Sequence, residues 1–306
     1  MDGITITMMA TNEQTIDALF DDLKRLMQPY GGRIRLEKQA YDEYAQIHCE
    51  RPVKTAWNQA LRSLIRGHIA SALAAYIVQE EERELLRSMI ITEFSYENEE
   101  DIDNILHYCS NMLDAPDDSG LAAEHSRQRR EQLISAELES FLKEHPMVNV
   151  QGLLQFRLQG YLEELREVLE YAMDEYLMDK QYQEFISLLK YFVFIQETKI
   201  PEAHLMHKGG NEFVILNEQM VPITADDVDE TLSVEWLDSD FNFEDLIVST
   251  LISVAPQRIT IHTREPDVPV IRTIVQIFEE RAKICHYCRV CKPLLGERSM
   301  QDQLSP

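Results

Sequence analysis

Residues 160–193 read GYLEELREVLEYAMDEYLMDKQYQEFISLLKYFV, and this stretch decides the fold class. Its apolar side chains recur every three or four residues, which is the spacing of one face of an α-helix. The pattern predicts a helix over about residues 150–177 and another over about 180–197, and Pro201 ends the block. The buried stripe of the first of these helices is expected to comprise Leu154, Leu158, Tyr161, Leu165, Leu169, Ala172 and Tyr176.

Helical periodicity also extends towards the N-terminus from this stretch. Pro52 suits the first turn of a helix that continues towards Phe94. Two more helices are expected over residues 99–113 and 121–144, and the linker APDDSG at 115–120 separates them because Pro, Gly and Asp break regular structure. The middle of the chain, residues 52–198, is therefore predicted to be a helical bundle.

Strand patterns flank this bundle on both sides. Residues 1–51 predict a small β-α-β-β unit, with strands at 3–9, 33–38 and 44–50 and a helix at 13–27. Residues 199–306 predict a C-terminal α+β part that contains a hairpin at 204–216, a third strand at 219–224, helices at 243–254 and 268–282, and a strand at 258–263. The expected fold is predominantly helical α+β.

The charge of the chain is strongly acidic and unevenly distributed. The sequence has 29 Lys and Arg against 54 Asp and Glu, a net charge of −25. Residues 1–78 contain nine basic and nine acidic residues, so the remainder carries the whole excess. Such a field repels phosphate backbones and anionic membranes, and we expect neither nucleic acid nor a membrane as a partner. With no secretory signal and no apolar run of about 20 residues, the chain is expected to be cytoplasmic.

A cysteine cluster near the C-terminus is the sharpest chemical feature. Cys285, Cys288 and Cys291 form two consecutive C-x2-C spacings, which let a tight turn direct three thiolates at one ion. The spacing predicts a zinc site or an iron–sulfur site. The ligand set is one short, and His286, His262, Cys109 or a partner chain would have to supply the fourth ligand. Two other interpretations remain: a redox-active pair with a third thiol, and three reduced thiols without a role.

Other polar groups carry weaker signals. His204 and His207 are three apart in a predicted strand, so they point to opposite faces, and we assign them no role. Basic residues in the neutral third of the chain, among them Lys54, Arg62 and Arg66, could form a modest basic surface, although carboxylates interrupt it. The sequence has no phosphate-binding glycine motif and no metalloprotease or serine-hydrolase motif. We expect a protein that is not an enzyme, and an enzyme on an unfamiliar fold, which would need a deep pocket with convergent polar groups, stays open as an alternative.

Three stretches carry a family resemblance. They are WNQALRSLIRGHIASALAAYIVQEEER at 57–83, the helical stretch at 160–193, and DLIVSTLISVAPQRITIHT followed by IFEERAKICHYCRVC at 245–263 and 277–291. On these residues the chain resembles the YtxC-like sporulation proteins of endospore-forming bacteria over nearly its full length. The resemblance implies a sporulation setting and supplies no catalytic residues. We therefore expect an interaction or regulatory protein with a protein partner, or alternatively a metal-binding or redox-responsive protein that uses the cysteine cluster.

Overall fold

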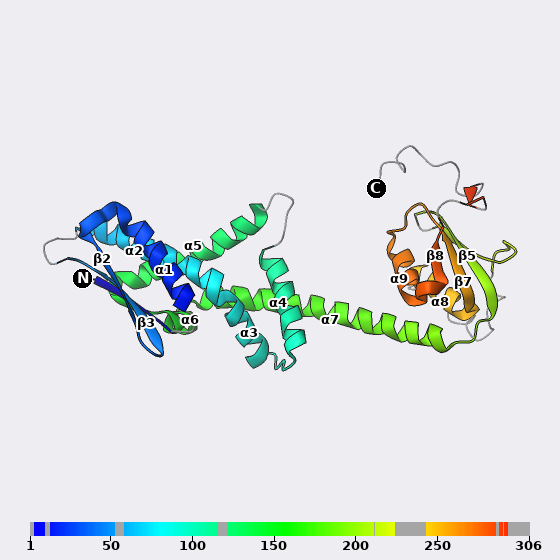
Figure 1. Cartoon of the computed structure of the whole chain (residues 1–306), viewed down its shortest axis with the longest axis horizontal. Helices are drawn as coiled ribbons and strands as arrows, with labels where there is room; N and C mark the ends of the chain where they lie inside the picture. The colour runs from blue at the N-terminus through cyan, green and yellow to red at the C-terminus, as the bar shows by residue number, and fades with distance from the viewer. Residues whose placement is uncertain are drawn as a thin grey trace. The chain divides into compact units, whose positions relative to one another are not determined.

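The structure is a computed structural model that describes residues 3–9, 13–52, 58–114, 121–210, 212–223, 243–285, 288–289 and 291–292. It confirms the predominantly helical α+β class. The contacts divide the chain into a first unit, Met1–Met178, and a second unit, Asp179–Pro306. Each unit is described by itself (Figure 1). The three segments 1–51, 52–198 and 199–306 stay a prediction about which stretches fold on their own.

A four-stranded sheet forms one side of the first unit. Its strands are β1 (Gly3–Met9), β2 (Arg35–Ala40), β3 (Tyr44–Glu50) and β4 (Met147–Asn149), in the order β2-β3-β1-β4. Ile4, Ile6 and Met8 alternate into the core, as the Ile- and Thr-rich pattern predicts. The strand β4 pairs in parallel with β1 and was not predicted, since three residues are too short to show an alternation.

The helices of the first unit share one hydrophobic core with the buried face of this sheet. They are α1 (Glu13–Met27), α2 (Gln59–Tyr76), α3 (Glu82–Thr92), α4 (Glu99–Leu113), α5 (Leu121–Glu144), α6 (Val150–Phe156) and the first part of α7 (Gln159–Ile195). The predicted helix towards Phe94 is interrupted by η2 (Ile77–Glu81), a single π-helical turn. The predicted break near residue 178 does not occur; the break lies at residues 157–158 instead, and α7 is one continuous helix.

One buried ion pair crosses the core of the first unit. The guanidinium of Arg130 lies 3.0 Å from a carboxylate oxygen of Glu82, and both side chains are almost fully buried. The hydroxyl of Tyr161 donates to the same oxygen of Glu82 at 2.7 Å, and Arg130 Nη2 donates to the other oxygen at 3.3 Å. Arg130 also donates to the carbonyl of Leu113. Glu82 is therefore a structural carboxylate, and both of its oxygens already have protein partners.

The second unit is a sheet covered by helices on one face (Figure 1). Its strands are β5 (Ile200–Gly209), β6 (Glu212–Asn217), β7 (Pro256–His262) and β8 (Ala282–Ile284), in the order β6-β5-β7-β8. The hairpin β5–β6 is antiparallel, whereas β5, β7 and β8 run parallel. The crossover helices α8 (Phe243–Val254) and α9 (Pro269–Phe278), with the end of α7, pack on Leu205, Ile261 and their neighbours.

Details of the second unit differ from the prediction. The predicted third strand at 219–224 forms only a single bridge between Leu216 and Pro222. The last predicted helix ends earlier, at η4 (Glu279–Arg281), and the short strand β8 follows. The predicted linker at 115–120 lies outside the described residues. Across the part of the chain that the structure describes, no helix combines the length and apolar character needed to cross a membrane.

Candidate metal centre

The cysteine cluster lies at the edge of the second sheet where the parallel strands end. His262 is the last residue of β7, and Cys285 directly follows β8. The backbone N–H of Cys285 donates to the carbonyl of Ile261 at 2.8 Å, so the chain continues the ladder for one more residue. Because the carboxyl ends of parallel strands meet at one edge, this pairing brings two residues 23 positions apart next to each other.

Four potential ligand atoms converge at this edge. One nitrogen of His262 and the sulfurs of Cys285, Cys288 and Cys291 all lie within 4.8 Å of one another. The sulfurs of Cys285 and Cys291 are 4.0 Å apart, and Cys288 Sγ is 3.8 Å from His262 Nδ1. A tetrahedral zinc with bonds of about 2.3 Å to sulfur and 2.0 Å to nitrogen requires ligand separations of about 3.8 and 3.5 Å. The spacing therefore fits a single zinc ion after a small contraction.

The surroundings of the four side chains exclude water from one side. Cys291 and His262 are fully buried, while Cys285 and Cys288 are half-buried. Cys291 packs with Met206 and Leu216 on the face of the sheet that carries no helix among the described residues. The backbone N–H of Cys288 donates to Cys291 Sγ at 3.1 Å. An N–H donor stabilises a thiolate, which is the form that binds metal.

Burial also sets the protonation of the ligands. It raises the pKa of the Cys291 thiol to about 11; the side chain of Cys288 raises this pKa further, whereas the backbone N–H of Cys288 lowers it. Burial lowers the pKa of His262, and the neighbouring His204 lowers it further. A neutral imidazole is the metal-binding form of histidine, so His262 needs no proton loss at neutral pH. The thiols lose their protons when metal binds.

His204 forms the outer support of the centre, which the sequence did not indicate. Its Nδ1 lies 3.2 Å from His262 Nε2, on the side of the ring opposite Cys288. A hydrogen bond from His262 Nε2–H to His204 would leave His262 Nδ1 as the atom that faces the thiols. His207 takes no part, because it lies on the other face of β5 and bonds to Thr263 and the carbonyl of Gly210. The parallel register pairs His204 with Thr260, so His204 and His262 are diagonal neighbours on β5 and β7, and no local sequence spacing shows this.

The structure distinguishes between the candidates for the fourth ligand by their positions. His262 is the one that the structure places with the three cysteines. Cys109 is buried in α4 in the core of the first unit and belongs to no such group among the described residues. His286 lies outside the described residues. The donor set is therefore complete within this chain.

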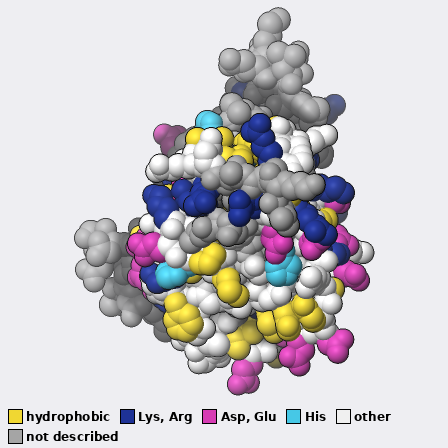
Figure 2. Space-filling model, turned by 90° about the vertical axis from the view of Figure 1, so that its left-hand side faces the viewer, with side chains coloured by type: hydrophobic (Ala, Val, Ile, Leu, Met, Phe, Trp, Pro, Cys, Tyr) yellow, Lys and Arg dark blue, Asp and Glu magenta, His cyan; other side chains and the backbone are white. Residues whose placement is uncertain are grey.

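Basic residues also gather on the first unit. Figure 2 shows a band of Lys and Arg side chains across one end of it, with carboxylates and hydrophobic side chains beside the band. Part of this charge is neutralised, since Arg35 pairs with Glu37 and Lys38 pairs with Asp17. Lys54 lies outside the described residues. The absence of a nucleic-acid partner stays a prediction.

Comparison with known proteins gives one family. The model of the YtxC-like family matches residues 67–283. "Uncharacterized protein YtxC" of Bacillus subtilis (strain 168) is 26% identical over 226 residues, which cover 72% of this chain and 77% of that protein. No solved structure matches. The family match ends before Cys285, so the histidine of the centre falls within the matched residues and the three cysteines follow it.

Proposed function

Because the chain belongs to the YtxC-like family, whose name states no chemistry, we propose a function from the metal centre itself. We propose that Cys285, Cys288, Cys291 and His262 bind one structural zinc ion, and that the protein works by binding another protein rather than by catalysis. The observation that carries this proposal is the convergence of three sulfurs and one imidazole nitrogen within 4.8 Å.

The number of ligands supports a structural role for the metal. Structural zinc sites have four protein ligands, whereas catalytic sites keep a position open for water or substrate. Three thiolates and one imidazole fill all four tetrahedral positions. They also place one negative charge in excess of the ion, which weakens it as a Lewis acid. This centre is suited to holding the chain after β8 against the sheet.

The short separations favour a single ion over an iron–sulfur cluster. A cluster lies between its ligands and pushes their sulfur atoms apart, and its usual ligands are four cysteines. Here Cys285 Sγ and Cys291 Sγ are only 4.0 Å apart, and one ligand is a histidine. Both features match the Cys3His type of zinc site.

The cellular setting is part of the same proposal. We assign the protein to the cytoplasm, where thiols stay reduced and available to a metal. We also assign it to sporulation, on the resemblance of residues 57–83, 160–193 and 245–291 to YtxC-like sporulation proteins. A protein partner fits a chain without a catalytic motif.

Elemental analysis tests the metal directly. The intact chain is purified without oxygen and without chelators, and its zinc and iron are measured together with an absorption spectrum. We expect about one zinc per chain and no visible absorption. Replacing zinc by cobalt should give a thiolate charge-transfer band that disappears in Cys288→Ser.

A matched control separates ligand loss from general damage. Cys109→Ser changes a buried thiol in α4 and should keep the full zinc content, whereas Cys285→Ser and His262→Ala should lose most of it. Wild-type protein without zinc or iron would refute the metal centre. Zinc that persists in all three ligand variants would place the ion elsewhere.

A further inference from the structure

The last three turns of α7 expose apolar side chains away from the core of the second unit. Ile186 and Val193 are buried in that core. Phe185, Leu188, Phe192 and Ile195 lie on a different side of the helix, and 46 to 64% of each is exposed. Apolar groups that surround a helix this completely are normally covered by another protein surface.

The spacing of these four residues is that of a helix–helix seam. The steps between them are three, four and three residues, so that Phe185 and Phe192, like Leu188 and Ile195, are seven residues apart, which is the a and d pattern of a coiled coil. The ion pair between Lys190 and Glu279, at 3.0 Å, fixes the opposite side of α7 to η4. We name Phe185, Leu188, Phe192 and Ile195 the α7 seam.

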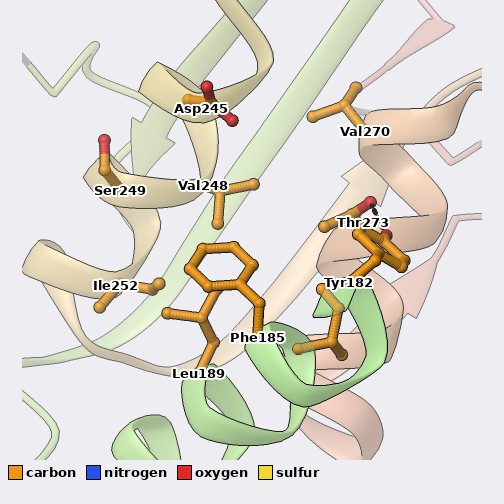
Figure 3. Close-up of a pocket in the computed structure, with 10 residues that line it drawn as sticks. Tyr182, Phe185, Leu189, Asp245, Val248, Ser249, Ile252, Val270 and Thr273 are labelled. Atoms are coloured by element: carbon orange, nitrogen blue, oxygen red, sulfur yellow. Dashed lines mark hydrogen bonds between the residues drawn. The ribbon is translucent and has the colours of Figure 1, made fainter. Parts of the chain in front are cut away.

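An apolar groove adjoins the seam (Figure 3). It has a volume of about 470 Å³ and lies between α7, α8 and α9. The ring of Phe185 points into it across from Val248, and Ile252 lines the α8 side. Tyr182 bonds to Thr273 at 3.0 Å and closes the α9 side. The groove offers a socket for a large apolar side chain next to the seam.

We propose that the α7 seam is a homodimer interface in which a second copy of the chain packs its own seam in the antiparallel direction. Charge supports a second copy as the partner. Residues 185–195 of α7 contain no carboxylate and one lysine, whereas residues 163–175 contain six carboxylates and one arginine. An acidic chain can therefore approach its own copy at this segment with little repulsion, and the antiparallel direction keeps the two acidic segments apart.

The available area supports the same partner. The seam together with the flanking Tyr182 and Tyr191 exposes roughly 600 Å² per copy, taking about 200 Å² for each fully exposed large side chain. A standard stable interface buries about 800 Å² per partner, and the walls of the groove supply much of the rest. In an antiparallel pair Phe185 would lie beside Ile195, and Leu188 beside Phe192.

Sedimentation velocity of the intact, zinc-loaded chain tests the proposal. The first measurement is the mass of the wild-type species, which distinguishes a monomer from a dimer. We expect a dimer that dissociates on dilution. Leu188→Glu should raise the dimer dissociation constant about 100-fold or more, because it buries an unpaired carboxylate against Phe192 of the second copy. Leu188→Gln, which adds no charge, should give a smaller increase. Leu188 is 64% exposed, so its replacement should leave the far-UV circular dichroism unchanged.

Phe194→Glu is the matched control. Phe194 is 79% exposed and lies roughly 140° around the helix from the seam, so its variant should dimerise like the wild type. A wild-type chain that stays monomeric at the highest concentration would overturn the proposal, whether another protein or the first unit covers the seam. A dimer that survives Leu188→Glu, or that Phe194→Glu disrupts equally, would also overturn it.

Discussion

Replacing His204 by alanine tests whether the outer support of the metal centre tunes its affinity. His204 Nδ1 lies 3.2 Å from His262 Nε2 and can accept its hydrogen bond. Losing a buried hydrogen bond of this kind costs about 1 to 1.5 kcal/mol, and losing an outer partner of a metal ligand typically lowers metal affinity about 10- to 100-fold. We therefore expect His204→Ala to weaken zinc binding about 10-fold while the zinc content at saturation stays near one per chain.

The assay is competition with a chromophoric zinc chelator at fixed pH, with the protein reduced. His207→Gln is the control, because His207 lies on the same strand but faces Thr263 and Phe213 rather than the centre. It should lower stability and leave the zinc affinity within about twofold, since it removes no partner of a ligand. An unchanged affinity in His204→Ala would refute the role of the His204–His262 contact. An equal loss in both variants would show that affinity follows strand stability instead.

Three further predictions concern the first unit, and denaturant unfolding monitored by circular dichroism measures each of them. Arg130→Met should lower the free energy of unfolding by about 3 to 5 kcal/mol, because it leaves Glu82 buried without its cation. Adding Glu82→Gln should recover part of the loss, and additive effects of the two substitutions would contradict an energetic coupling between Arg130 and Glu82. Gly67→Ala should stabilise α2 by about 0.5 to 1 kcal/mol, since the new Cβ would meet only the flexible carboxylate end of Glu139, at 3.1 Å. Destabilisation would show that the side chain of Glu139 cannot move. Hydrogen bonds from Arg166 lower the pKa of Glu93, so this contact stabilises the fold at pH values above the usual carboxyl pKa, and the stabilisation is lost as the pH falls through the lowered pKa. Arg166→Gln should therefore lower the free energy of unfolding by about 0.5 kcal/mol at pH 7 and leave it unchanged in acid. A loss of stability that persists in acid would refute the ionic origin.

Periodic patterns in the sequence predicted most of the secondary structure. The bounds of β1, α1, β3 and α4 agree with their predicted ranges, because each buries one regular face. The short strands β4 and β8 escaped prediction, since three residues carry no measurable alternation. The continuity of α7 near residue 178 also escaped, because charged and polar residues there look like a helix end, although the backbone needs no apolar face to stay helical.

Only the ligands of the candidate site that lie close together in the sequence were predictable. Three cysteines in C-x2-C spacing are visible within seven residues, and His262 stood among four candidates for the missing ligand. Selecting His262 requires the parallel pairing of β7 with β8, and finding His204 requires the register of β5 against β7. Both depend on tertiary contacts between residues 23 and 58 positions apart, which a single sequence does not specify.

Among the described residues, the sheet of the second unit has helices on one face and, around Met206 and Leu216, mainly the cysteine cluster on the other. Under the proposed zinc binding, a face covered in this way depends on a supply of metal rather than on hydrophobic surface. If zinc binds as proposed, chain made in zinc-poor cells would expose this strip of sheet to proteases and degrade faster. The abundance of the protein would then report the zinc status of the cell, without any dedicated sensor.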